Sequence, residues 1–212
     1  MITVIANLKG GSGKSTIAFN LALWLQMQGE EVITYDLDPQ QTLNDVAMLR
    51  IEDGTEPVLK VYKSRADKVS KDLQAHSCHV LVDVGASNLD AMNAAIYSAD
   101  RVVIPVQPSQ PDVWATQRFL KMVKQACVDK APELIAFINR ADTHYSVTES
   151  DEAEQALLML DSVNVLPVRI CQRTNFRRAL SEGLSIFELS GKSKSAKEFN
   201  DFAHALYPEL IN

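Results

Sequence analysis

The sequence is poor in cysteine, glycine and proline, and it contains no apolar run of bilayer length. Its three cysteines, Cys78, Cys127 and Cys171, lie far apart and form no Cys-x-x-Cys pair, which argues against a disulfide framework and indicates thiols in a reducing cytoplasm. Eight glycines and eight prolines are too few for a disordered or fibrous chain. No basic leader with a cleavage site precedes the first strand, so we expect a cytoplasmic protein without a membrane partner.

The composition is that of a folded chain with an acidic surface. Hydrophobic residues make up 46% and charged residues 23% of the chain, which suits one well-buried core. Its length of 212 residues is short for two ordinary domains. We therefore expect a single domain over residues 1–212. Because the formal net charge is -6, any attraction to nucleic acid or anionic lipid has to come from a local basic patch.

Short apolar runs alternate with amphipathic stretches of helix length along the whole chain. The predicted strands are 2–6, 31–36, 58–62, 79–84, 101–106, 134–139 and 163–170. The predicted helices are 17–28, 65–76, 88–98, 111–128, 149–160, 174–182 and 194–207, and Ser190–Ser195 is the predicted flexible loop. This alternation predicts an α/β fold with a doubly wound, mostly parallel sheet, whose ligands bind beyond the carboxyl ends of the strands.

A glycine loop follows the first strand and leads directly into a helical pattern. The loop and the first helical residues are Lys9, Gly10, Gly11, Ser12, Gly13, Lys14, Ser15 and Thr16. Backbone N–H groups of such a loop converge on phosphate, and the helix N-terminus adds partial positive charge. We expect Lys14 to bridge the β- and γ-phosphates, Ser15 to ligate Mg²⁺ and Thr16 to touch the α-phosphate. The alternative is a glycine-rich turn that precedes a helix by coincidence.

The loop departs from the generic phosphate-loop pattern at one position. Leu8 stands where that pattern has glycine, and Lys9 precedes the glycine pair. In this respect the segment resembles the deviant Walker A motif of the ParA/MinD ATPases, a class of P-loop NTPases. The resemblance implies that Lys9 reaches across a nucleotide-sandwich homodimer to the ATP of the other subunit. The alternative for Lys9 is a solvated surface lysine.

Three aspartates follow apolar strands in an order that is also typical of these ATPases. Asp36 and Asp38 are two residues apart and point the same way from a strand or its extension, so one can support Mg²⁺ while the other aligns water. The resemblance implies the water for Asp38 and the metal for Asp36. Asp83 ends the apolar segment Val80–Val82 and resembles a Walker B aspartate that holds Mg²⁺. The continuation through Gly85 is less typical than the Thr-Pro often found there.

Two later segments extend the resemblance, which covers residues 2 to about 190. The segment from Val106 to Pro111 resembles the loop that follows a strand in this family, and Asn139 ends the next apolar strand. Asn139 is a candidate for adenine recognition because its amide offers a donor and an acceptor together. The alternative is a turn former. No helix-turn-helix precedes Ile2, and in this respect the sequence resembles the small ParA proteins, which lack one.

Basic residues gather in the last fifth of the chain. They are Arg169, Arg173, Arg177, Arg178, Lys192, Lys194 and Lys197. Against them stand Glu182 and Glu188, so the stretch carries seven minus two, or +5. Clustered basic residues are typical of sequence-independent DNA binding, which small ParA proteins perform as dimers. A solvated helix face is the alternative.

The last predicted helix has an apolar face that includes Phe199, Phe202 and Leu206. Such a face could anchor a MinD-like protein to a membrane surface. Glu198 and Asp201 would be repelled by anionic lipid, so we predict that the face is core.

The resemblance as a whole implies an ATPase that works as a conformational switch. It would bind ATP and Mg²⁺, form a homodimer, hold nucleoid DNA without sequence preference, and hydrolyse ATP slowly until a ParB-like or cargo-adaptor protein stimulates it. Lys9, Lys14 and Asp38 would be the catalytic residues. The cargo could be a plasmid, a chromosome or a protein organelle. A MinD-like positioning ATPase is the main alternative; a metabolic enzyme on the same fold, such as a dethiobiotin synthetase relative, and a non-catalytic nucleotide-binding module are the others.

Overall fold

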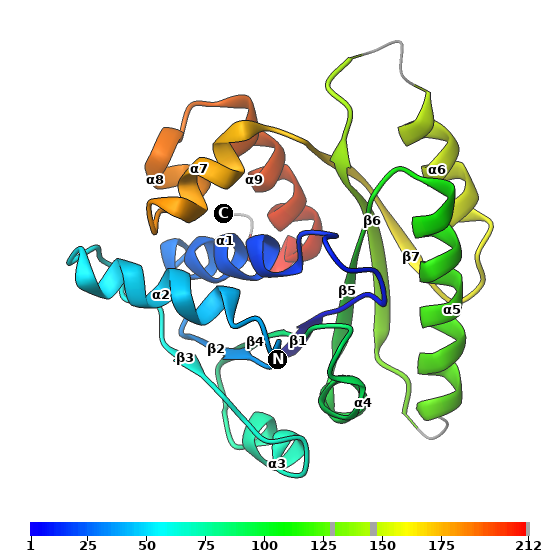
Figure 1. The fold of residues 1–212 in the computed structure, drawn as a ribbon, viewed down its shortest axis with the longest axis horizontal. Helices are drawn as coiled ribbons and strands as arrows, with labels where there is room; N and C mark the ends of the chain where they lie inside the picture. The colour runs from blue at the N-terminus through cyan, green and yellow to red at the C-terminus, as the bar shows by residue number, and fades with distance from the viewer. Residues whose placement is uncertain (128–129, 145–147, 211–212) are drawn as a thin grey trace.

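The fold is built on one parallel sheet. The computed structural model describes residues 1–127, 130–144 and 148–210, and within them seven strands form a sheet in the order β3-β2-β4-β1-β5-β6-β7 (Figure 1). The strands are β1 (Ile2–Ile5), β2 (Val32–Asp36), β3 (Val61–Tyr62), β4 (His79–Asp83), β5 (Arg101–Val106), β6 (Glu133–Ala141) and β7 (Asn164–Cys171). Every neighbouring pair is parallel. The predicted doubly wound α/β fold is confirmed.

Helices form in all the regions where the sequence predicted them, and two further helices were not predicted. They are α1 (Lys14–Met27), α2 (Thr42–Glu52), α3 (Val69–Gln74), α4 (Leu89–Ser98), α5 (Gln110–Ala126), α6 (Glu149–Leu158), α7 (Thr174–Ser181), α8 (Ile186–Ser190) and α9 (Lys194–Leu206). The sequence patterns predicted neither α2 nor α8. Residue 128, the predicted end of α5, lies outside the described residues.

The predicted loop Ser190–Ser195 is wrong in extent. Ser190 still belongs to α8, and α9 already begins at Lys194. Only a turn of three residues separates the two helices, because the Ser193 hydroxyl accepts a hydrogen bond from the Ala196 N–H at 3.1 Å and so caps α9 early.

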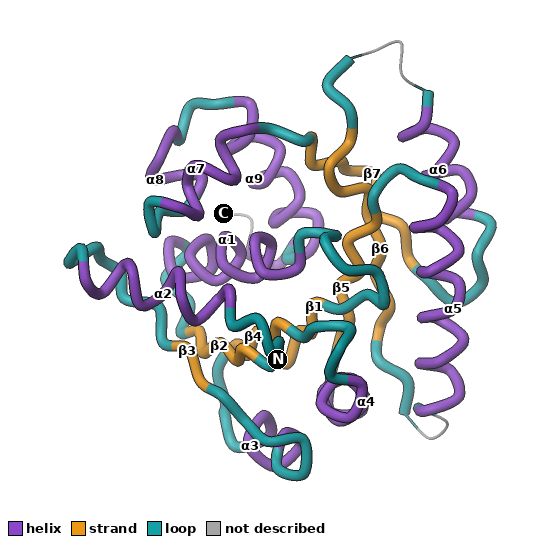
Figure 2. Tube along the Cα trace, viewed as in Figure 1, coloured by secondary structure: helices purple, strands orange, loops and turns teal. Residues whose placement is uncertain are grey.

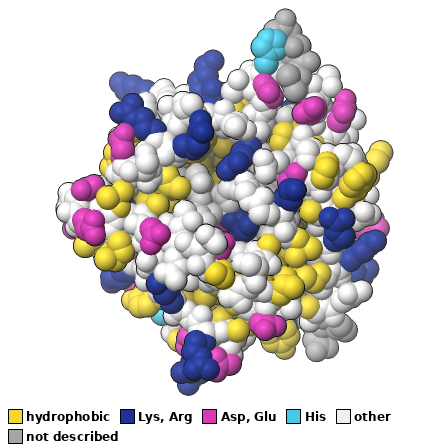
Figure 3. Space-filling model, viewed as in Figure 1, with side chains coloured by type: hydrophobic (Ala, Val, Ile, Leu, Met, Phe, Trp, Pro, Cys, Tyr) yellow, Lys and Arg dark blue, Asp and Glu magenta, His cyan; other side chains and the backbone are white. Residues whose placement is uncertain are grey.

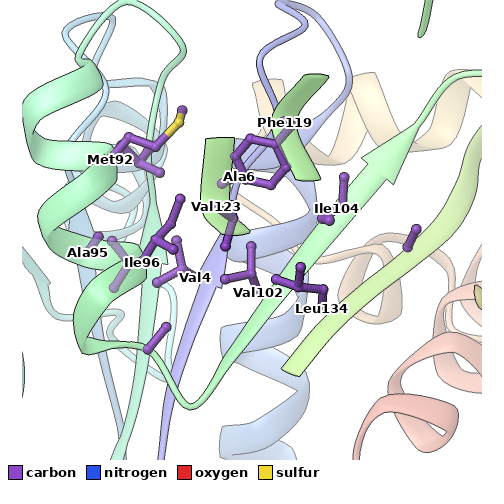
Figure 4. Packing of buried hydrophobic residues seen from close by; sticks show 14 of the residues in the cluster. Val4, Ala6, Met92, Ala95, Ile96, Val102, Ile104, Phe119, Val123 and Leu134 are labelled. Carbon is purple, nitrogen blue, oxygen red and sulfur yellow. The ribbon is translucent and has the colours of Figure 1, made fainter. Parts of the chain in front are cut away.

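Helices cover both faces of the sheet, so the central strands are apolar on both sides. Along β5, Val102 and Ile104 face the layer that contains α3, α4, α5 and α6, whereas Val103 faces the layer of α1, α2, α7, α8 and α9 (Figures 1 and 4). These three side chains are fully buried. Each contributes about 1.5–3 kcal/mol by leaving water. This burial on both faces explains the continuous apolar runs in the sequence.

The register of the central strands brings three chain segments to one edge of the sheet. Asp83 at the end of β4 pairs with Ile5 of β1 on one side and with Asp36 of β2 on the other. The glycine loop leaves β1 at this level, and the loops after β2 and β4 lie beside it (Figure 2). Because β1 is where the strand order reverses, this edge is also where ligands of such sheets bind.

Candidate nucleotide site

The glycine loop is shaped to receive an anion. Gly11 and Gly13 have φ angles of 76° and 92°, in the left-handed region that glycine adopts without a steric cost. Gly13 is the N-cap of α1, and no side chain accepts a hydrogen bond from the first turn of this helix. The N–H groups there are therefore available to phosphate oxygens, and the helix dipole adds to the attraction.

Two lysines flank this loop in different environments. Lys14 is only 7% exposed, and its Nζ lies 3.5 Å from the Lys9 carbonyl oxygen, so the ammonium group is folded back over the loop. Lys9 itself is exposed, and its backbone N–H donates to Asn7 Oδ1 at 3.3 Å. The structure thus places Lys14 inside the loop. The side chain of Lys9, by contrast, makes no hydrogen bond or ion pair with any described residue.

Asp83 is fully buried, and among the described residues neither of its carboxylate oxygens has a hydrogen-bond partner in good geometry, although the Ser15 hydroxyl is near. Burial raises the pKa of Asp83 to about 7; the Ser15 hydroxyl and the Lys14 charge act against this, and Asp36 and Asp38 add to it. A buried carboxylate without a partner is costly. A divalent cation next to Ser15 would remove that cost, so the residues present fit the Mg²⁺ that the sequence predicted.

Asp36 ends β2 and Asp38 lies in the loop that follows, and the two side chains have different exposures. Asp36 is 3% exposed, and burial raises its pKa although the backbone N–H groups of Asn44 and Asp38 donate to its oxygens at 2.9 and 3.1 Å. Asp38 is partly exposed, and its Oδ1 accepts from the Gln40 N–H at 2.9 Å. Asp36 therefore holds the start of α2, whereas Asp38 keeps an oxygen for another partner.

The described residues contain no group of three or more His, Cys, Asp or Glu side chains arranged to hold a metal ion. Mg²⁺ in phosphate sites keeps several waters and takes one or two protein oxygens, which Ser15 and Asp83 would supply.

Asn139 has a role that its sequence position did not reveal. Its Nδ2 donates to the Ser12 carbonyl oxygen at 2.7 Å, and a Cβ added at Gly13 would lie 2.5 Å from the same nitrogen. The amide thus fastens the glycine loop to the end of β6. This bond uses one of the two N–H donors of the amide, so the second donor and the carbonyl oxygen remain for an adenine ring.

Sequence reasoning assigned no role to two further residues of the site. Gln107 Nε2 donates to the Gly11 carbonyl oxygen at 3.3 Å, and Asn7 Nδ2 donates to the Pro105 carbonyl oxygen at 3.0 Å. Both hold the glycine loop against the end of β5. Gln107 belongs to the family-like loop found in the sequence, so that motif was the available signal; Asn7 carried none.

The predicted DNA-binding residues fall into two groups. Arg169 is paired with Asp151 and Glu154, Arg173 with Glu198, and Arg178 with Glu182. The others are exposed and form no ion pair with any residue that the structure describes; they are Arg177, Lys192, Lys194 and Lys197. Lys and Arg side chains gather over α7, α8 and α9 and toward the centre of the face in Figure 3.

The apolar face of α9 is core, as the sequence predicted. Phe199 and Phe202 are fully buried, and Leu206 is nearly so. Phe202 stacks on Phe137 of β6, with ring centroids 4.4 Å apart. In the described part of the chain, no helix is long and apolar enough to cross a membrane.

The chain is similar to known proteins over nearly its whole length. The family described as "CobQ/CobB/MinD/ParA nucleotide binding domain" matches residues 3–186. Maintenance of carboxysome distribution protein A from Halothiobacillus neapolitanus is 30% identical over 210 residues, covering 96% of this chain and 95% of the relative. Protein ParA from Rhizobium radiobacter is 24% identical over 219 residues, covering 99% and 97%.

Solved structures share the fold at lower sequence identity. A Cyanothece McdA(D38A)–ATP complex has a TM-score of 0.76 at 22% identity and covers 97% of this chain and 96% of its own. A putative plasmid partition protein from Borrelia burgdorferi bound to AMPPNP has a TM-score of 0.78 at 18% identity, with 98% of each chain covered. MinD from Pyrococcus horikoshii complexed with Mg-ADP has 0.74 at 20% identity, covering 97% and 95%.

The family match spans most of the chain, and it begins in β1 and includes the glycine loop, the three aspartates and Asn139. The predicted resemblance is therefore confirmed. The chain belongs to the CobQ/CobB/MinD/ParA nucleotide-binding family and is a ParA/MinD-family ATPase.

Proposed function

We propose that this protein is a cytoplasmic ATPase that binds Mg-ATP and closes into a nucleotide-sandwich homodimer. It would hydrolyse ATP to segregate or position a cargo. The observation that carries the proposal is the pair of unsatisfied features at one sheet edge: an uncapped helix N-terminus and the buried, unpartnered Asp83. A triphosphate with its metal would satisfy both at once.

Each residue of the site has a part in this proposal. Gly10, Gly11, Ser12 and Gly13 supply the loop N–H groups, and the Lys14 ammonium moves from the Lys9 carbonyl to the β- and γ-phosphates. Ser15, Asp36 and Asp83 hold the metal directly or through water, and the metal neutralises charge on the transferred phosphoryl group. Asp38 orients the attacking water, and Thr16 contacts the α-phosphate.

The family resemblance suggests the dimer, and the exposure of Lys9 supports it. An exposed cation beside the phosphate loop is free to reach a nucleotide held by a second copy, and two lysines at one triphosphate would stabilise the transition state. The two copies would also bring their basic surfaces together. Non-specific DNA is the partner proposed for that composite surface, since two weak sites side by side multiply in affinity.

The cargo is carried by a ParB-like or other adaptor protein that stimulates hydrolysis. The carboxysome-distribution relative and the ParA relative are both consistent with positioning or partition. We favour DNA over a membrane as the surface, because the apolar face of α9 that could enter lipid is already buried.

The test is ATP binding and turnover in two variants. We expect Lys14→Ala to bind ATP roughly 100-fold more weakly, whereas Asp38→Ala should bind ATP and dimerise but release almost no phosphate over hours. Calorimetry, size-exclusion chromatography with light scattering and a phosphate-release assay measure the three properties. Rapid turnover by Asp38→Ala would contradict the role of Asp38, and absence of ATP binding by the native protein would contradict the whole proposal.

A further inference from the structure

The carboxylate of Asp38 lies directly against the backbone of Gly85, in the loop that follows β4. A Cβ added at Gly85 would come within 2.6 Å of Asp38 Oδ1, and closer still to Cγ and Oδ2. These three carboxylate atoms are the nearest obstacles to such a Cβ. Real Cβ atoms do not approach other atoms this closely, so a side chain at position 85 and the present position of Asp38 exclude each other.

Two hydrogen bonds hold the two loops together around this contact, and a third orders the loop after β2. The Leu37 N–H donates to the Asp83 carbonyl oxygen at 2.8 Å, and Asn88 Nδ2 donates to the Leu37 carbonyl oxygen at 3.2 Å. The Gln40 N–H donates to Asp38 Oδ1 at 2.9 Å. The backbone on either side of Asp38 is thereby fixed, and its carboxylate is left with Gly85 beneath it.

Steric room, and not backbone conformation, is the reason for glycine here. Gly85 is absent from the glycines with positive φ, so alanine could adopt its backbone angles without strain. Gly11 and Gly54 show the opposite case, with positive φ and open space around the added Cβ. The cost of a side chain at position 85 therefore falls on one group, the Asp38 carboxylate, which would swing away because it ends a short flexible side chain.

We infer that Gly85 is a positioning residue for hydrolysis: its missing side chain is what allows the loop after β4 to set the place of the Asp38 carboxylate. This inference rests on the proposed function of Asp38. A methyl group at position 85 would leave the phosphate loop and the metal-binding oxygens of other side chains in place. It would displace the Asp38 carboxylate, which is the group proposed to align water.

The first experiment is a kinetic double-mutant cycle with Gly85→Ala, Asp38→Ala and the double variant. We expect Gly85→Ala to bind ATP as the native protein does but to hydrolyse it about 100-fold more slowly, as misplacement by about 1 Å can do. In the Asp38→Ala background the same substitution should cost nothing further. Ser87→Ala, an exposed position in the same loop, is the matched control and should keep native turnover.

The second experiment does not depend on catalysis. In nucleotide-free protein, the backbone amide resonance of Gln40 reports its hydrogen bond to Asp38, so it should shift in Gly85→Ala in the direction seen for Asp38→Ala and stay unchanged in Ser87→Ala. If the resonance shifts but no form hydrolyses ATP, the proposed function fails and the positioning contact stands. An unshifted resonance, native turnover in Gly85→Ala, loss of ATP binding in that variant, or an equal slowing in the Asp38→Ala background would each overturn the inference.

Discussion

Two regions of the molecule bury charge, and they treat it in opposite ways. Arg50 of α2 is fully buried, and all three of its guanidinium nitrogens donate: to the Pro57 carbonyl, to the Gly183 carbonyl and to both carboxylate oxygens of Glu188. Asp83 is buried as completely, and neither of its oxygens has a well-formed hydrogen bond to any residue that the structure describes. A satisfied buried charge ties the fold together, whereas an unsatisfied one indicates a site made for a ligand.

The largest effect should come from breaking the satisfied cluster. Arg50→Ala leaves the partly buried Glu188 carboxylate without its partner and two carbonyls without donors, which we expect to cost about 3 kcal/mol of unfolding free energy. Urea denaturation followed by circular dichroism measures this loss. Arg178→Ala breaks an exposed pair and should leave the midpoint unchanged. If replacing both partners by Met and Leu failed to recover stability, the loss would not be due to the stranded charge.

The unsatisfied region should show its largest effect in binding. Lys14→Ala removes a cation from the phosphate site, and a hydrogen bond to a charged group is worth up to about 3 kcal/mol, or roughly 100-fold in the dissociation constant for ATP. Stability without nucleotide should change little, since the Lys14 ammonium makes one long hydrogen bond, at 3.5 Å, to the residues that the structure describes. Calorimetric titration and a melting curve of the same sample separate the two. A large drop in stability with unchanged binding would reverse the comparison.

The same contrast explains which parts of the molecule could be predicted from the sequence. The strands were predictable because burial on both faces leaves continuous apolar runs, as in Val80–Val82. Helix α2 was not predictable from its N-terminus, because its N-cap, Gln41, is in a left-handed conformation at φ 56° and provides no side-chain cap. In addition, Arg50 fixes this helix through contacts with residues far along the chain. Local patterns do not contain such long-range partners.

The site follows the same division. The aspartates and the glycine loop could be predicted because each follows a strand, and parallel strands bring their ends together. The contact of Gly85 with Asp38 and the tie from Asn139 to the Ser12 carbonyl could not, because both join segments that meet only in the folded chain. The sequence count of +5 for the basic stretch did not show which arginines are paired: Asp151, Glu154 and Glu198 lie outside the stretch and pair with two of its arginines.

Stability should also depend on pH in opposite directions in the two regions. The pKa of Asp83 is raised from 3.8 to about 7, so its contribution is fully present below pH 3.8 and is lost as the pH rises toward 7. Burial raises the pKa of Glu188, but the hydrogen bonds from Arg50 outweigh this and hold that pKa below its ordinary value. The contribution of Glu188 to stability is therefore lost as the pH falls. Thermal melts of native protein and Asp83→Asn across this range should differ most near neutral pH.

Magnesium and ATP should remove the Asp83 part of this dependence. A bound divalent cation favours the ionised carboxylate and compensates its burial, so the melting temperature of the native protein should no longer fall toward pH 7. EDTA should restore the fall. A pH profile that is identical with and without Mg-ATP would mean that the cation is not held near Asp83.

The smallest expected effect distinguishes paired from unpaired arginines on the basic surface. Arg177 has no ion pair with any described residue, whereas Arg173 donates to Glu198 through two of its nitrogens. If the ATP-bound form holds DNA, Arg177→Ala should reduce the slope of log affinity against log salt by about 1, and Arg173→Ala should leave it nearly unchanged. Fluorescence anisotropy with duplexes of two unrelated sequences measures both slopes. Equal losses for the two variants would mean that the Glu198 pair opens on DNA, and the distinction between satisfied and unsatisfied charge would then not extend to the surface.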